Sequence, residues 1–151
     1  MTLAVYRILI NLIFLFSPII ILIRILKGKE DLNRFPEKLG FFSKKKVGKK
    51  LIWFHGASVG ELLSVIPLIE NLEKDKNINQ ILLTSSTISS AKVFSKFKFK
   101  KTIHQFFPID SNIISKKFIN FWKPSISIFI DSEVWPNIIL NLNKEKIPII
   151  L

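Results

Sequence analysis

The chain has 151 residues, of which 48% are apolar and 14 are Phe; this is enough for one domain with a hydrophobic core and argues against intrinsic disorder. It contains no cysteine, so disulfides, thiolate metal sites and cysteine nucleophiles are excluded. The formal net charge of +12 favours polyanionic partners, namely nucleic acid, anionic lipid or a phosphorylated glycolipid.

The first element is an uncharged segment from Ile8 to Ile23, bracketed by Arg7 and Arg24. As a helix it would be roughly 24 Å long, and with its flanking residues it approaches the ~30 Å hydrocarbon core of a bilayer. We expect residues 1–26 to form a membrane anchor that spans the bilayer or is deeply embedded in it. Two other interpretations stay open. One is a cleaved signal peptide, for which the following RILKGKE provides no small-residue cleavage site, and the other is a buried core helix.

Basic residues dominate the segment that follows the anchor, whereas only Arg7 precedes it, so the positive-inside rule places the body in the cytoplasm. The first basic group comprises Arg24, Lys27, Lys29, Arg34 and Lys38. The second comprises Lys44, Lys45, Lys46, Lys49 and Lys50. We interpret residues 27–50 as a basic linker whose second group lies close to the anionic leaflet or in a solvated loop.

Residues 51–151 alternate between short apolar runs and segments in which apolar residues recur at helical spacing. We expect strands at 51–55, 80–85, 103–107, 125–130 and 148–151. We expect helices at 58–74, 87–97, 110–122 and 134–146, and Asp110 is the expected capping residue of the third. This alternation predicts an α/β, Rossmann-like domain with a parallel sheet. The chain stops on an apolar run without the helix that should follow it, so we expect the domain to be truncated at its C-terminal end.

Ligands of such sheets bind beyond the carboxyl ends of the strands, and the segment HGASVGE (55–61) follows the first strand. Ser58 and Glu61 have the spacing of a capping box. In this motif the Ser58 side chain bonds to the backbone N–H of Glu61, and the Glu61 side chain reaches back to the start of the helix. Glu61 has a second interpretation as a general base that takes a proton from an attacking sugar hydroxyl.

The segment DSEVWPN (131–137) follows the strand at 125–130. Asp131 or Ser132 could cap the next helix, and Pro136 is tolerated in a first helical turn. The functional interpretation is that a carboxylate here binds sugar hydroxyls or stabilises positive charge developing at an anomeric carbon. His55 and His104 are the two histidines of the chain, so a His-rich metal site is excluded, and we expect no metal.

At these residues the chain resembles the Kdo transferases, glycosyltransferases of GT-B fold that move 3-deoxy-D-manno-octulosonic acid (Kdo) from CMP-Kdo to the lipid A precursor. The resembling stretches occur in the family's order along nearly the whole chain. They are RFPEKLG (34–40), HGASVGE (55–61), the Thr- and Ser-rich stretch 84–90, HQFFPID (104–110), SEVWPN (132–137) and IPI (147–149).

The resemblance implies that Glu61 is the catalytic base and that Asp131 and Glu133 stabilise the substrate or the transition state. It implies that the acceptor is bound by Ser58, Gly60, Arg34 and Asn137. It also implies CMP-Kdo as donor, lipid IVA as acceptor and no cofactor, at the bacterial inner membrane with the body facing the cytoplasm. The family usually has Glu where this chain has Asp131. Because the family's donor-binding half is absent, we expect this chain alone to be inactive.

Two alternatives to this function remain. The chain could be another GT-B glycosyltransferase with a different acceptor, or a non-catalytic, membrane-anchored basic interaction module. Binding to nucleic acid is disfavoured by the apolar anchor and by the lack of a groove-reading motif of basic and aromatic residues.

Overall fold

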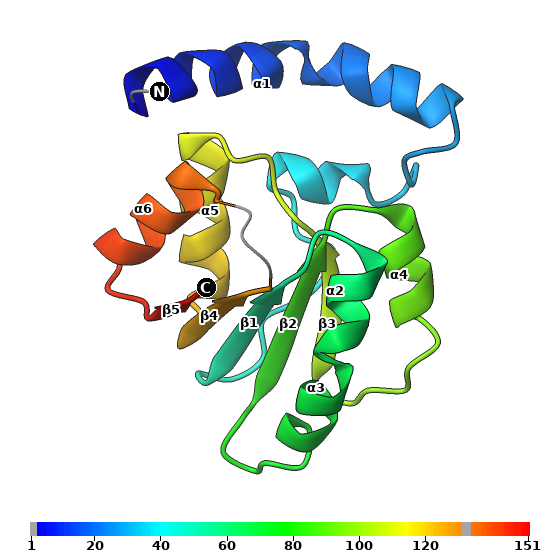
Figure 1. Ribbon diagram of the computed structural model, residues 1–151, viewed down its shortest axis with the longest axis vertical. Helices are drawn as coiled ribbons and strands as arrows, with labels where there is room; N and C mark the ends of the chain where they lie inside the picture. The colour runs from blue at the N-terminus through cyan, green and yellow to red at the C-terminus, as the bar shows by residue number, and fades with distance from the viewer. Residues whose placement is uncertain (1–2, 131–133) are drawn as a thin grey trace.

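The computed structural model describes residues 3–130 and 134–151, which form a Rossmann-like α/β domain with a long apolar helix lying across one end (Figure 1). The helix is α1 (Leu3–Leu26). A short 3-10 helix, η1 (Phe35–Leu39), connects it to the domain.

The sheet has five parallel strands in the order β3-β2-β1-β4-β5. Their bounds are β1 Leu51–His55, β2 Gln80–Ser85, β3 Thr102–Phe106, β4 Ile126–Phe129 and β5 Ile149–Ile150. The expected α/β class with a parallel sheet is confirmed. Such a sheet is covered on both faces, which explains why β2 is buried along its whole length.

Helices cover the two faces of the sheet separately (Figure 1). Helices α2 (Val59–Ser64), α3 (Ile66–Leu72) and α4 (Ile88–Phe94) pack on one face. Helices α5 (Asn112–Trp122) and α6 (Pro136–Lys144) pack on the other, where Trp53 of β1 contacts Phe118 with ring centroids 5.0 Å apart. Adjacent residues of β1 therefore serve two different cores: Trp53 faces α5, and Phe54 faces α2 and α3.

The segment 58–74, expected as one helix, is divided into α2 and α3. The break falls at Val65, two residues before Pro67. Proline has no N–H to donate, and its ring clashes with the carbonyl four residues earlier, so a continuous helix cannot run through this position.

The segment 27–50 packs against the domain more closely than a linker would. Glu37 of η1 is buried, and its carboxylate accepts a hydrogen bond from the backbone N–H of Phe106 at the end of β3. Gly48 adopts φ +71°, and a Cβ there would lie 2.4 Å from Cγ of Asn79, so this turn requires glycine.

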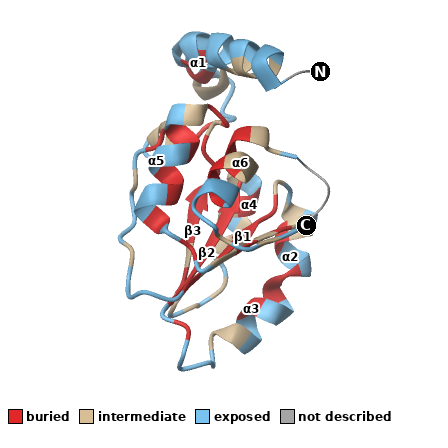
Figure 2. Ribbon diagram, turned by 90° about the vertical axis from the view of Figure 1, so that its left-hand side faces the viewer, coloured by how far each residue is buried: buried red, intermediate tan, exposed pale blue. Residues whose placement is uncertain are grey.

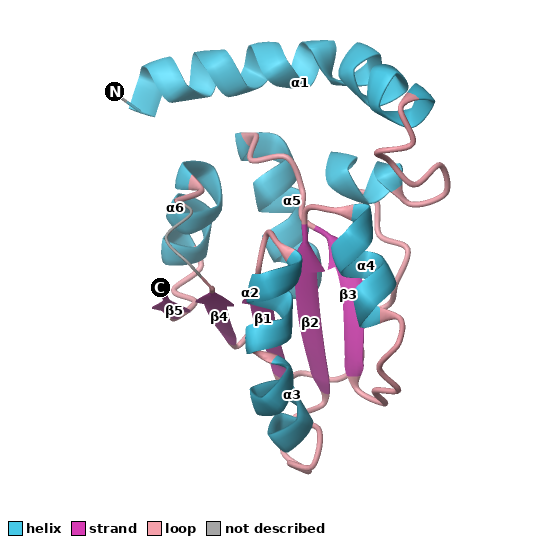
Figure 3. Ribbon diagram, turned by 45° about the vertical axis from the view of Figure 1, so that its right-hand side comes forward, coloured by secondary structure: helices cyan, strands magenta, loops and turns pink. Residues whose placement is uncertain are grey.

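The second lysine group lies at the opposite end of the sheet from α1. The backbone N–H groups of Lys49 and Lys50 bond to Asn79, immediately before β2 begins. The strands point away from this end and toward α1 (Figure 3). The second lysine group and α1 therefore do not form one membrane-facing surface.

Candidate active site

The centre of the sheet is the point at which its strand order reverses. The chain builds β1, β2 and β3 outward in one direction and then returns to place β4 on the other side of β1. The N–H of Ile130, just after β4, donates to the carbonyl of His55 at the end of β1, with N and O 2.8 Å apart. The chain continues from β1 to α2 on one face and from β4 to α6 on the other, and ligands of this fold bind at such a switch point.

The strands that precede the two sequence segments singled out for chemistry, β1 and β4, are therefore neighbours at this point. Glu61 follows β1, whereas Asp131 and Glu133 follow β4. Asp131 and Glu133 lie outside the residues that the structure describes, so their expected roles stay predictions.

Glu61 is held by two hydrogen bonds, one to each carboxylate oxygen. Oε2 accepts from the backbone N–H of Ala57 at 2.7 Å, and Oε1 accepts from the hydroxyl of Ser58 at 2.5 Å. The Ser58 hydroxyl oxygen in turn accepts from the N–H of Glu61 at 3.3 Å. This is the capping arrangement expected from the sequence, with the glutamate reaching one residue further back than in the usual box. It fixes the carboxylate at the carboxyl end of β1.

Two glycines around Glu61 have different structural roles. Gly56 is buried, and a Cβ on it would lie 3.0 Å from Cβ of Glu61, so glycine is what allows the first turn of α2 to pack on the strand end. Gly60 is exposed, and a Cβ there would have Oγ of Ser58, at 3.9 Å, as its nearest contact. Packing therefore does not require glycine at position 60, and the space beside this residue is open.

His55, the last residue of β1, is buried. Its ring stacks on Phe107 with centroids 3.8 Å apart, and Nδ1 lies 3.0 Å from Oγ1 of Thr84. Burial lowers the pKa of His55 to about 3, so the ring is neutral at physiological pH. A neutral ring locked between strands supports the loop after β1 and does not act as an acid.

The start of α6 is held by Asp110, a role that sequence reasoning missed. Asp110 was expected to cap α5, but the cap of α5 is Ser111. The Asp110 carboxylate accepts instead from the backbone N–H groups of Asn137 and Ile138, at 3.0 and 2.8 Å. It also accepts from the hydroxyl of Tyr6 in α1 at 2.6 Å. Burial raises the pKa of Asp110, while these three hydrogen bonds oppose the rise.

Asn137 is completely buried in the same network. Its Nδ2 donates to the carbonyl of Asp110 at 2.6 Å, and its Oδ1 accepts from Nε of Arg7 at 3.1 Å. The side chain expected to bind the acceptor therefore holds α6 and α1 to the strand ends.

Arg34 lies at the β3 edge of the sheet, two strands away from β1. Its guanidinium makes a two-pronged ion pair with buried Glu37, at 2.8 and 2.9 Å, and also donates to the carbonyl of His104 at 3.0 Å. It lies over the ring of Phe106, 4.7 Å from its centroid. These contacts fix η1 to β3, and the structure does not bring Arg34 to Glu61.

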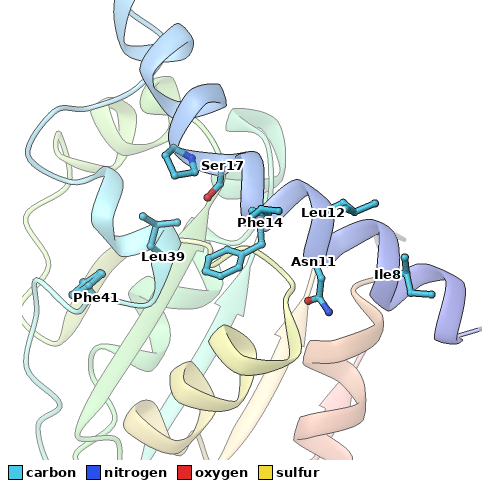
Figure 4. A pocket seen from close by; sticks show the side chains of 9 residues that line it. Ile8, Asn11, Leu12, Phe14, Ser17, Leu39 and Phe41 are labelled. Carbon is cyan, nitrogen blue, oxygen red and sulfur yellow. The ribbon is translucent and has the colours of Figure 1, made fainter.

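An apolar hollow of about 880 Å³ lies between α1 and the chain leading out of η1 (Figure 4). We call it the α1 hollow. It is lined by Ile8, Asn11, Leu12, Phe14, Leu15, Ser17, Pro18, Leu39 and Phe41. Its lining can accept a hydrocarbon chain but offers little to a sugar or a nucleotide.

Within residues 3–130 and 134–151, no group of three or more His, Asp or Glu side chains could hold a metal ion. The expectation that the chain uses neither metal nor cofactor stays a prediction.

Comparison with known proteins shows to which family the chain is similar. Residues 33–151 match the family model described as 3-deoxy-D-manno-octulosonic-acid transferase (kdotransferase). A protein of Rickettsia bellii named 3-deoxy-D-manno-octulosonic acid transferase is 43% identical over 135 residues, covering 87% of this chain and 32% of that protein.

Two further relatives carry the same name in distant organisms. The Arabidopsis thaliana protein, named a probable and mitochondrial transferase of this kind, is 35% identical over 148 residues, covering 96% of this chain and 33% of its own length. The Haemophilus influenzae protein is 29% identical over 120 residues, covering 79% and 28%. The chain thus spans about a third of the length of these relatives. With its family match running through β1 and β4 to the last residue, the chain belongs to the Kdo transferase family.

Proposed function

We propose that this chain is the acceptor-side part of an enzyme that transfers Kdo from CMP-Kdo to the lipid A precursor lipid IVA. The observation that supports this most is the position of Glu61, whose carboxylate is fixed at the carboxyl end of β1 beside β4. That is where a sheet of this type binds its ligands. The donor site would be supplied by the part of the relatives that this chain does not cover.

In the proposed reaction, Glu61 accepts the proton of an acceptor hydroxyl as its oxygen attacks the anomeric carbon of Kdo and CMP leaves. Each carboxylate oxygen already accepts one hydrogen bond, but a carboxylate has about four lone-pair positions, so both can accept a second. Capping and catalysis are therefore compatible. The bonds from Ala57 and Ser58 orient the group for proton transfer.

Among the residues expected to bind the acceptor, Ser58 and Gly60 are exposed beside Glu61 and remain our candidates. Arg34 and Asn137 are engaged in internal contacts, and we assign them to holding η1 and α6 in place. Asp131 and Glu133 remain candidates for stabilising charge at the anomeric carbon.

For localisation we propose the bacterial inner membrane, with α1 as anchor and the body in the cytoplasm. Helix α1 is long and apolar enough to cross a membrane, by length and composition. We also keep the three-part division into an anchor (1–26), a connecting segment (27–50) and an acceptor-binding domain (51–151) as a proposal.

The test uses a chimera in which this chain replaces the matching third of the Rickettsia bellii relative. Membranes carrying it are given CMP-Kdo and lipid IVA, and the product is followed by mass. Transfer that is lost with Glu61→Gln supports the proposal, because glutamine keeps the shape of the cap but cannot take a proton. Absence of transfer by the parent chimera would favour a different acceptor or a non-catalytic membrane module.

A further inference from the structure

Helix α1 is attached to the domain at both of its ends. Near its start, Tyr6 bonds to Asp110 at 2.6 Å and Arg7 bonds to Asn137 at 3.1 Å. Near its end, Arg24 forms an ion pair with Glu30 at 2.5 Å. The three acceptor residues, Asp110, Asn137 and Glu30, are all buried.

The Glu30 contact reaches the carboxyl end of the sheet. Its carboxylate also binds Lys38 at 2.8 Å, and the Lys38 ammonium donates to the carbonyl of Ser86, just after β2, at 3.2 Å. Both ends of α1 are therefore tied to the same edge of the same sheet. Figure 1 shows the helix lying across that edge.

This attachment conflicts with a helix that crosses the bilayer. Tyr6 and Arg24 are 18 residues apart, which is about 27 Å along a helix at 1.5 Å per residue. That length is close to the ~30 Å hydrocarbon core. If α1 crossed the membrane, one of its ends would lie near the far surface and could not contact a domain on the near side.

The sidedness of α1 agrees with its attachment. Its polar side chains fall within an arc of about 140° at 100° per residue. They are Tyr6, Arg7, Asn11, Ser17 and Arg24. The opposite side carries Val5, Phe16 and Ile23, which are 46%, 53% and 47% exposed. Figure 2 shows that most of the helix is exposed above the buried sheet.

The surroundings of α1 suit a bilayer surface. The α1 hollow beneath the helix is apolar, so lipid chains fill it more favourably than water does. Lys27 and Lys29, at the end of the helix, are exposed and can contact anionic headgroups.

From these contacts we infer that α1 lies in the plane of the membrane as a monotopic anchor, with its apolar side in one leaflet and its polar side on the domain. The bilayer surface then lies over the carboxyl edge of the sheet, close to the loop that holds Glu61. A lipid-linked acceptor could reach Glu61 without leaving its leaflet. The inference rests on the proposed membrane association but not on the transfer reaction.

The test measures the depth of three positions on the outer side of α1. The chain has no cysteine, so Val5→Cys, Phe16→Cys and Ile23→Cys each provide one site for a nitroxide label in the full chain. Along the helix, Phe16 is about 16 Å from Val5 and about 10 Å from Ile23. In phospholipid vesicles containing anionic lipid, electron paramagnetic resonance with oxygen and a polar nickel complex reports each depth. Equal depths, within a few ångströms, are expected. A Phe16 label about 10 Å deeper than both others would overturn the inference.

A second measurement determines on which side of the membrane the N-terminus lies. A cysteine is added ahead of Met1, and Lys76→Cys, an exposed position at the far end of the domain, marks the domain side. Sealed vesicles are treated with an impermeant maleimide from one side. Reaction of both cysteines from the same side is expected, and reaction from opposite sides would overturn the inference. If the label depths are equal but the chimera transfers no Kdo, the proposed enzymatic function is contradicted and the in-plane orientation of α1 is still supported.

Discussion

The hydroxyl of Tyr6 donates a 2.6 Å hydrogen bond to the carboxylate of Asp110, joining residues 104 positions apart. The same carboxylate accepts from the first backbone N–H groups of α6. One buried side chain thus holds both α1 and α6, the helix that begins within the DSEVWPN segment.

Because α1 and α6 share the Asp110 carboxylate, two substitutions should lower the free energy of unfolding by different amounts. Tyr6→Phe removes one hydrogen bond and should lower the free energy of unfolding by about 1 kcal/mol. Asp110→Asn places an amide NH₂ against buried N–H donors and should cost at least twice as much, roughly 2–3 kcal/mol. Urea unfolding in detergent measures both values. Equal costs for the two variants would mean that Asp110 does not hold α6.

The two glycines beside Glu61 should respond differently to alanine. Gly56→Ala brings a Cβ to 3.0 Å from Glu61, so it should displace the carboxylate and reduce transfer by the chimera more than tenfold. Gly60→Ala meets open space and should leave stability unchanged or raised by up to about 1 kcal/mol. Reduced transfer by a stable Gly60→Ala variant would place the acceptor beside it, whereas unchanged transfer would remove Gly60 from the acceptor site.

Acidification should destabilise the domain through its two buried histidines. Burial lowers the pKa of both His55 and His104 to about 3, and the positive charge of Arg34 adds to the effect on His104. Between pH 6.5 and 3 the unfolded chain therefore binds protons that the folded chain does not, and stability falls as pH falls. Each histidine contributes about 1.4 kcal/mol per pH unit inside that window.

The raised pKa of Asp110 works in the opposite direction, because the folded state then gains stability as pH falls through that pKa. The histidine effect is best measured between pH 6 and 5, above the usual range of carboxyl groups. Urea unfolding measures how the free energy of unfolding changes with pH. In His104→Gln this slope should be smaller by the equivalent of about one proton taken up on unfolding. A slope that His104→Gln leaves unchanged would contradict this account.

Arg34 should prove to be a structural residue. Arg34→Ala leaves the buried Glu37 carboxylate without its guanidinium partner, which should cost about 3 kcal/mol or more. Arg34→Ala combined with Glu37→Gln should recover part of that loss. If Arg34 instead bound the acceptor, a stable variant would show a raised KM for lipid IVA, which we do not expect.

The sequence was most informative where residues act locally. The alternation of apolar runs predicted all five strands, and the spacing of Ser58 and Glu61 predicted their mutual hydrogen bonds. The apolar spacing of 58–74 predicted one helix, and the break between α2 and α3, just before Pro67, was not predicted.

Long-range partners could not be predicted in the same way. The spacing before α5 suggested that Asp110 caps that helix, but its partners lie in α1 and α6. Arg34 matched a family motif, yet its position beside Glu37 and His104 depends on how η1 docks on β3. Contacts of this kind depend on the order of strands in the sheet, which periodicity does not reveal.

The central claim is that Glu61 acts as a base and not only as a cap, and the most direct measurement compares kcat and KM of Glu61→Gln and Ser58→Ala in the chimera. We predict that Glu61→Gln lowers kcat by about 10²-fold or more, with KM for lipid IVA and stability nearly unchanged. Ser58→Ala, which removes one hydrogen bond to the carboxylate but leaves it ionisable, should lower kcat much less. A Glu61→Gln variant that turns over as fast as the parent would contradict the claim and leave Glu61 as a helix cap.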